Sequence, residues 1–255
     1  MILDIFFQYW SIILLFFLAA ILYSSVGFGG GSSYLALLAL TGILFTQIKT
    51  TALLCNIVVV SGNVFLFYQQ KKINWQKIIP LVFFSVPFAF IGGYLIISEK
   101  FFFIILGCTL LFAAITMWIS KKIVSLETTN LPSKPIKNSF YGAIIGFVSG
   151  MVGIGGGIFL APLLHLKNWD TPEKIAAAAS FFILINSSAG LLGQYANPNF
   201  VMDWKFTSIL LITVFIGGQI GSRLSNRYFM PIQLKKATAI LIAFVSLRIL
   251  WEYLF

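Results

Sequence analysis

Long apolar runs, each able to cross a lipid bilayer as a helix, follow one another along almost the whole chain. A hydrocarbon core of about 30 Å takes about 20 helical residues at 1.5 Å per residue. The sequence is 59% hydrophobic and only 9% charged, whereas soluble domains carry roughly 25% charged residues. No stretch between the runs is long enough for a separate soluble domain. We therefore expect an all-α integral membrane protein.

The apolar runs form two similar series, and the longest run of each series is interrupted by glycines. The first series comprises about 5–44, 50–68, 77–97 and 101–120, and the second comprises about 139–166, 174–195, 204–222 and 234–254. We expect residues 1–120 and 139–255 to be two membrane repeats, joined by a polar cytoplasmic linker at 121–138.

Short glycine motifs recur at matching places in the two series. Gly27-Phe28-Gly29-Gly30-Gly31 returns as Gly153-Ile154-Gly155-Gly156-Gly157, and Ile91-Gly92-Gly93 returns as Ile216-Gly217-Gly218. Because both pairs are separated by about 125 residues, an internal duplication is the simplest explanation.

The net charge of +10 would suggest nucleic-acid binding in a soluble protein, but here the basic residues lie in short connections between apolar runs. Cytoplasmic loops of membrane proteins are rich in Lys and Arg. We assign three basic connections to the cytoplasm, and the nearly neutral ones near 99–100 and 203–205 to the outside. The charge thus indicates topology and contact with the lipid bilayer, and no nucleic-acid partner. The basic residues are Lys71, Lys72 and Lys77, then Lys121, Lys122, Lys134 and Lys137, then Arg223, Arg227, Lys235 and Lys236.

This topology requires each glycine-interrupted run to be a hairpin that enters and leaves the membrane on one side. The arms 139–152 and 157–166 would measure about 21 and 15 Å as helices, too short for a comfortable crossing. The run 5–44 is then a hairpin from the outside, although its arm 5–26 is long enough to span alone. We predict two repeats of inverted topology, each a glycine-broken helical hairpin plus three transmembrane helices, with both termini outside.

Two glycine-broken hairpins in matching positions indicate a central binding site, because non-helical backbone at membrane depth must be enclosed by protein or line a watery cavity. After each motif a helix restarts, near Ser32 and Ile158, and its free N–H groups and positive dipole end suit an anion. Glycine also lets a ligand approach the backbone closely. The alternative is that the small residues only allow close helix packing, and that intramembrane Asn and Ser side chains only bond between helices. The predicted anion-binding residues are Ser24, Ser25, Gly29, Gly30, Gly31, Ser32, Asn56, Gly153, Gly155, Gly156, Gly157, Ser180 and Asn186.

Several residue types that would indicate other functions are missing from the predicted spans. No Asp or Glu lies in the middle of a span, so a buried-carboxylate proton relay is not indicated. Cys55 and Cys108 have no metal-binding spacing, and we expect no metal or cofactor. The single histidine, His165, has none of the sequence context of an intramembrane hydrolase, so an enzyme is disfavoured.

The second glycine motif and its surroundings resemble the TauE/SafE sulfite exporter-like transporters, also called the TSUP family. The resemblance rests on the segment 146–157, on the arm ending at Pro162, and on Ala176–Ser180, with a weaker copy at 24–31. The family usually has Ala-Thr-Ser where this chain has Ala178-Ala179-Ser180, so a hydroxyl is missing at position 179. The resemblance implies transport of sulfite or an organosulfonate across the plasma membrane, the inner membrane of a bacterium.

We therefore predict a secondary transporter that moves a small anion by alternating access, with one repeat rocking against the other around the central site. An interior-negative potential of about 100 mV favours anion exit by roughly 2.3 kcal/mol per charge, whereas uptake would need a coupling ion, H⁺ or Na⁺. An anion channel or a permease-type subunit for another small anion is the alternative. The direction, the coupling ion and the formation of a homo-oligomer are left open by the sequence.

Overall fold

The computed structural model describes residues 2–119, 135–167, 169–198, 200, 202–224 and 231–254, and every regular element in these ranges is a helix. The predicted all-α membrane class is therefore confirmed. Of the basic residues used for topology, Lys121, Lys122, Lys134 and Arg227 lie outside the described ranges. The helices are α1 (Ile2–Ser25), α2 (Gly31–Ala39), α3 (Phe45–Gln69), α4 (Trp75–Tyr94), α5 (Glu99–Ile119), α6 (Pro135–Val152), α7 (Gly157–Leu166), α8 (Pro172–Tyr195), α9 (Trp204–Leu224) and α10 (Pro231–Leu254).

The helix order is a hairpin followed by three longer helices, repeated once. Within the described part of the chain, five helices are long and apolar enough to cross a membrane. Large apolar side chains on the outer surface are exposed, such as Phe83 and Ile212, as expected for helices that face lipid. The five candidate spans are Phe7–Ser25, Phe45–Gln69, Trp75–Tyr94, Pro172–Tyr195 and Trp204–Leu224.

The helix boundaries of the hairpins differ from the predicted ones by amounts that have local causes. α2 and α7 each start one residue earlier than expected, directly after Gly30 and Gly156, whose φ angles of 88° and 82° no helix can continue. The long first arm is not one straight helix, because α1 has a non-helical residue at Tyr9. The stretch after that kink, 10–25, is about 24 Å long, close to the predicted length of the matching arm in the second half.

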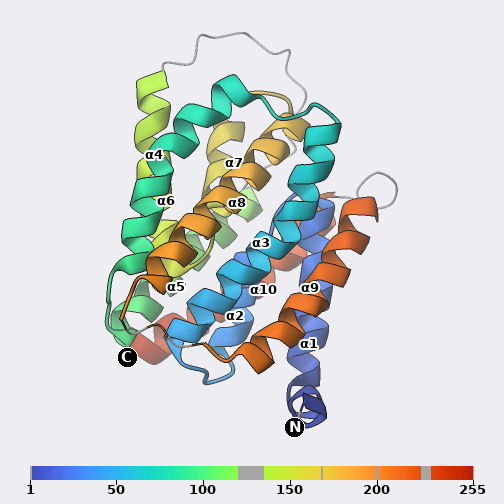
Figure 1. Cartoon of the computed structure of the whole chain (residues 1–255), viewed down its shortest axis with the longest axis vertical. Helices are drawn as coiled ribbons and strands as arrows, with labels where there is room; N and C mark the ends of the chain where they lie inside the picture. The colour runs from blue at the N-terminus through green and yellow to red at the C-terminus, as the bar shows by residue number, and fades with distance from the viewer. Residues whose placement is uncertain are drawn as a thin grey trace.

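Two ends of the molecule differ in charge. The connection between α3 and α4, which carries Lys71 and Lys72, lies near the upper end in Figure 1, and α9 ends at Leu224, just after Arg223, at the helix end that points toward it. We call this the basic end. Both chain termini and the connection from α2 to α3 lie at the opposite end.

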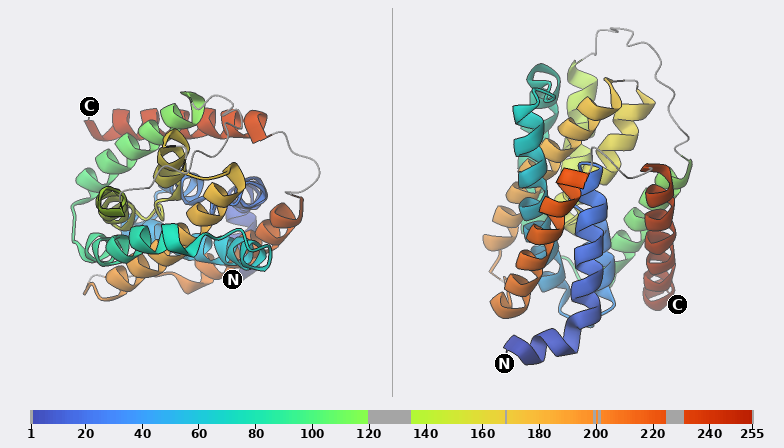
Figure 2. Two further views of the ribbon diagram at one scale, coloured as in Figure 1. Left: turned by 90° about the horizontal axis from the view of Figure 1, so that it is seen from above. Right: turned by 90° about the vertical axis from the view of Figure 1, so that its right-hand side faces the viewer.

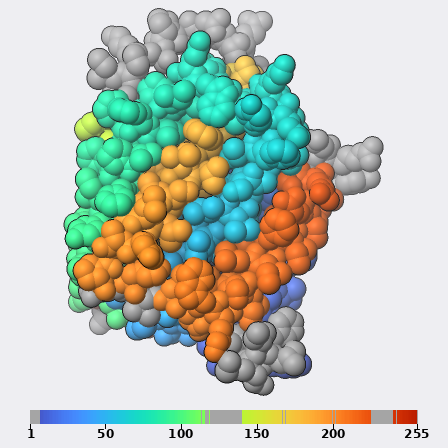
Figure 3. Space-filling model, in the orientation of Figure 1, coloured from blue at the N-terminus to red at the C-terminus, as the bar shows by residue number. Residues whose placement is uncertain are grey.

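The helices are arranged in layers. On one face, α4, α8, α3 and α9 run side by side as diagonal bands (Figure 3). The short helices α2 and α7 lie behind them, between this face and the pair formed by α5 and α10 (Figure 2, left). The short arms of both glycine-broken hairpins are thus placed inside the protein, whereas α1 and α6 also face outward.

The packing of the two halves follows one scheme. When α1 to α5 are matched with α6 to α10, nearly every helix pair in contact has a counterpart in contact: α1 packs on α9 as α6 packs on α4, and α3 packs on α9 as α8 packs on α4. Two of the contacts are between matching helices of the two halves, α3 with α8 and α5 with α10, so exchanging the halves leaves these pairs unchanged. The halves therefore interlock.

The repeated Gly-Gly pairs serve this helix packing. A Cβ at Gly92 on α4 would overlap the Phe147 carbonyl of α6, and a Cβ at Gly217 on α9 would lie 2.8 Å from the Phe17 carbonyl of α1. Small residues let the backbones of membrane helices approach closely. For these two glycines the helix-packing alternative raised by the sequence is the one that the contacts support.

Candidate functional site

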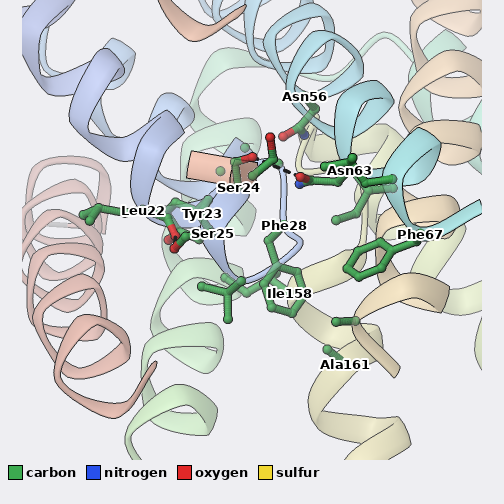
Figure 4. Close-up of a pocket in the computed structure, with 18 of the residues that line it drawn as sticks. Leu22, Tyr23, Ser24, Ser25, Phe28, Asn56, Asn63, Phe67, Ile158 and Ala161 are labelled. Atoms are coloured by element: carbon green, nitrogen blue, oxygen red, sulfur yellow. Dashed lines mark hydrogen bonds between the residues drawn. The ribbon is translucent and has the colours of Figure 1, made fainter. Parts of the chain in front are cut away.

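One large cavity of about 770 Å³ penetrates the protein from the basic end. Its outer part is lined by residues of that end, including Lys72, Glu173 and Arg223, and its inner part ends at Gly29–Gly31 and Asn56. Phe28 and Phe67 form part of its wall between these levels (Figure 4). The cavity therefore connects one side of the protein with the first glycine loop.

The first glycine loop presents a helix N-terminus to the cavity. Gly27 and Gly30 adopt φ angles of 84° and 88°, which turn the chain from α1 into α2. The Ser180 hydroxyl of α8 donates a hydrogen bond to the Gly27 carbonyl and so holds the loop from the second half. At the start of α2, the Tyr34 N–H donates a hydrogen bond to the Gly30 carbonyl at 3.0 Å. The N–H groups of the residues before it, on the first turn of α2, have no helical acceptor.

Asn56 of α3 joins the two glycine loops. Its Nδ2 donates to the Ile154 carbonyl at 2.9 Å, and its Oδ1 has no partner among the described residues. A Cβ at Gly29 or at Gly31 would overlap the Asn56 amide, and a Cβ at Gly155 would lie 3.0 Å from Nδ2. Glycine is required at these positions because the amide occupies the space where a side chain would be. The contact lies at the inner end of the cavity.

Ser24 and Asn63 lie next to each other on the cavity wall (Figure 4). The single proton of the Ser24 hydroxyl is shared between two acceptors, the Gly218 carbonyl at 2.7 Å and Asn63 Oδ1 at 3.0 Å. With Oδ1 placed in this way, Nδ2 of Asn63 is left without a partner among the described residues, although the side chain is only 3% exposed. Nδ2 itself has almost no accessible surface, so it lies beside the cavity wall and would bond an anionic or carbonyl ligand only after a local rearrangement.

The mouth of the cavity carries more positive than negative charge. The carboxylate among its lining residues is Glu173, and it pairs with Lys72 at 2.9 Å. Arg223, which the topology argument placed in a cytoplasmic connection, also lines the cavity. The lining is therefore electrostatically favourable for an anion that approaches from this end.

A polar cluster beside the mouth ties the α7–α8 connection to the start of α4. The Asp170 carboxylate, whose side chain is 6% exposed, pairs with Lys77 at 3.1 Å and Lys174 at 3.4 Å, and accepts a hydrogen bond from the Thr171 N–H at 3.0 Å. Burial raises the pKa of Asp170, but the bonds from Thr171 and Lys77 outweigh it, so the pKa lies below its ordinary value.

About half of the predicted anion-binding residues line the cavity. Ser180 and Asn186 are fully buried and do not line it, and the second glycine loop borders it only through Ile154 and Ile158. Gly156 faces Phe182. The predicted residues on the lining are Ser24, Ser25, Gly29, Gly30, Gly31, Ser32 and Asn56, and those away from it are Gly153, Gly155, Gly156, Gly157, Ser180 and Asn186.

Asn63 was missing from the predicted set. The available signal was its spacing: seven residues from Asn56 corresponds to nearly two helical turns, so the two amides lie on the same face of α3. The aromatic wall formed by Phe28 and Phe67 had no such signal, because Phe is frequent throughout the sequence.

A helical membrane protein with two interlocked halves, broken hairpins at its centre and one cavity reaching them has the general form of a secondary transporter. The family model for the sulfite exporter TauE/SafE matches residues 12–249. The chain belongs to the TauE/SafE family, as its sequence motifs had indicated.

Relatives with similar sequences are named as transporters. The probable membrane transporter protein y4hK of Sinorhizobium fredii is 35% identical over 92% of this chain and 96% of its own length. The probable membrane transporter protein YjnA of Bacillus subtilis is 26% identical over 93% of this chain and 98% of its own length. No solved structure matches the chain. The family and these relatives indicate a multi-pass membrane transporter and not an enzyme.

Proposed function

We propose that this protein carries a small anion, sulfite or an organosulfonate, across the plasma membrane by alternating access between two repeats of inverted topology. The observation that carries the proposal is the closed inner end of the cavity. The cavity gives an anion access to Gly29–Gly31 from one side only, because the contact between Asn56 and Ile154 blocks the way forward. A carrier needs such a barrier, whereas an open channel needs a continuous path.

The donors near the barrier support an anionic substrate. They are the free N–H groups on the first turn of α2 and the unpartnered Nδ2 of Asn63. The carboxylate on the lining, that of Glu173, pairs with Lys72 at the mouth of the cavity and not with the residues at its inner end. Sulfite and sulfonates present three oxygen atoms that such donors can bond. The choice of sulfur rests on the family's description as sulfite exporters.

The shared packing scheme supports the inverted repeats. Under exchange of the halves, the hairpin α1–α2 with its partner α9 maps onto the hairpin α6–α7 with its partner α4. With the basic end on the cytoplasmic side, the cavity is open inward and the structure corresponds to the inward-facing state of an exporter. The outward-facing state would arise when one repeat rocks against the other.

The test is transport of labelled sulfite and of a labelled sulfonate in proteoliposomes that contain the purified protein. Under an imposed membrane potential we expect saturable flux that unlabelled substrate competes for, and counterflow of label against preloaded substrate. Dependence on a proton or Na⁺ gradient would instead assign a coupled carrier. Absence of flux of both compounds under every gradient would refute the sulfur assignment, and flux without saturation or counterflow would refute the carrier.

A further inference from the structure

A second, smaller cavity lies at the end of the protein opposite the basic end. Its volume is about 60 Å³, enough for a small ion or a few water molecules. It is formed where the first turns of α3 meet the last turns of α4 and α8. Its lining includes Phe45, Thr46, Lys49, Leu95 and Gln194.

Two polar side chains of this cavity, Lys49 and Gln194, carry hydrogen-bond donors for which the described residues supply no acceptor. Lys49 is only 4% exposed, and no carboxylate of the described residues pairs with it; its ammonium lies 5.9 Å from the centroid of the Phe102 ring. Gln194 is 6% exposed, and its Nε2 has no described partner, because the Thr50 hydroxyl bonds Oε1 at 2.7 Å. An anion beside a buried cation and a buried amide donor without an acceptor would stabilise both groups.

Lys49 also continues the polar face of α3 that lines the large cavity. Gln70, Asn63 and Asn56 line that cavity and are spaced by seven residues, and Lys49 is seven residues beyond Asn56 in the same direction. Seven residues along a helix correspond to about 10.5 Å and nearly two turns. One face of α3 thus leads from the basic end, through the barrier at Asn56, to Lys49.

The small cavity occupies the position that corresponds to the large one in the other half. α3 and α8 are matching helices of the two halves, and they follow Leu44 and Thr171, respectively. When positions are counted from these two residues, three residues on the lining of the small cavity match three residues of α8. Phe45, Thr46 and Lys49 correspond to Pro172, Glu173 and Ala176. The latter three line the mouth of the large cavity. The small cavity therefore lies where the counterpart of that mouth is expected in the other half.

We propose that Lys49 and Gln194 form a second anion-binding site, which the transported anion occupies on the far side of the Asn56 barrier. This inference rests on the proposed function and adds the second half of the path. The site holds the anion after it has passed the glycine loops, and it opens to the opposite side when the large cavity closes. Charge balance explains why a lysine is tolerated here with no acidic partner in the described chain.

The test compares Lys49→Met, which keeps the length of the side chain without its charge, with Lys49→Arg and with the exposed control Lys100→Met in sided proteoliposomes. For Lys49→Met we expect KM for sulfite added at the opposite end to rise about tenfold, equivalent to 1.4 kcal/mol, while KM from the basic end stays within about threefold. Lys49→Arg and Lys100→Met should retain KM on both sides. An unchanged KM from the opposite end in Lys49→Met would overturn the proposal.

A binding measurement separates this inference from the proposed function. If wild type moves no sulfite, the thermal stabilisation of the purified protein by sulfite and by chloride is compared between wild type and Lys49→Met. A smaller stabilisation in Lys49→Met, with Lys100→Met unaffected, would support an anion site at Lys49 even though sulfite transport had failed. Equal stabilisation in all three proteins would refute the site.

Discussion

The sharpest perturbation of the central cavity is Asn63→Asp. Nδ2 of Asn63 is a buried, unpartnered donor beside the cavity wall, whereas Oδ1 lies 3.0 Å from the Ser24 hydroxyl, whose proton it shares with the Gly218 carbonyl. Aspartate has nearly the same shape and keeps the acceptor for Ser24. The substitution therefore changes one property of the site: a free donor becomes a negatively charged acceptor.

The expected loss of affinity follows from two contributions. A hydrogen bond to a charged group contributes about 1.5–3 kcal/mol. Repulsion between two unit charges about 4 Å apart costs roughly 4 kcal/mol at an effective dielectric constant near 20. Water in a cavity of about 770 Å³ will screen part of the repulsion, so we expect KM for sulfite to rise at least about 100-fold, or about 2.7 kcal/mol.

The assay is sulfite flux in proteoliposomes at several concentrations, with Asn63→Leu as the matched neutral control. Asn63→Leu loses the donor and the acceptor without adding a charge, and Ser24 retains the Gly218 carbonyl at 2.7 Å, so its KM should rise about tenfold. A melting temperature near that of wild type would show that each variant is folded. A folded Asn63→Asp protein with KM within threefold of wild type would refute the anion site at this wall.

Three further substitutions test the glycine loops, the helix packing and the polar cluster at the mouth. Gly156→Val should abolish sulfite flux in vesicles while membrane insertion persists, because position 156 has a φ of 82° and no space for a side chain; normal flux would show that the second loop has no part in transport. Gly150→Val should lower the melting temperature, since its Cβ would overlap the Ala89 carbonyl where α6 meets α4, at a cost of about 1–3 kcal/mol; an unchanged melting temperature would contradict the close packing. Asp170→Asn should lower the stability at pH 7 by about 1–3 kcal/mol through the loss of the charged bond to Lys77. Because the folded pKa of Asp170 is lowered, its contribution is present above the ordinary value of 3.8 and disappears as pH falls through the folded pKa; the melting difference from wild type should therefore shrink in acid, and a constant difference would contradict the role of its charge.

The apolar runs and glycine interruptions of the sequence predicted the helices well, because each depends on local properties. Apolar length gave the helices, and glycines that can take positive φ gave the breaks at Gly30 and Gly156. The start of α3 was placed too late, after Lys49, because a lysine was taken to end an apolar run. In the structure α3 begins at Phe45, and the lysine is buried by contacts from other helices, which no local pattern contains.

The candidate site was predictable only where backbone conformation defines it. Gly29–Gly31 line the cavity as expected, but Ser180 and Asn186 carry hydroxyl and amide groups that are used within the protein. Whether an intramembrane polar side chain faces a cavity or another helix depends on how the helices are rotated. Rotation is set by the contacts between the halves, so it could not be obtained from composition or spacing alone.

The position of Asn56 explains how one residue can separate two half-paths. It is the point where α3 meets both glycine loops: the Asn56 amide fills the space beside Gly29 and Gly31 and bonds the Ile154 carbonyl. Because the first loop belongs to one hairpin and Ile154 to the other, a rocking motion of one repeat against the other must change this contact. A hydrogen bond of about 1 kcal/mol net can be exchanged for bonds to a bound anion, whereas an apolar barrier would offer no such exchange. A polar barrier on the polar face of α3 can therefore close the path without preventing passage.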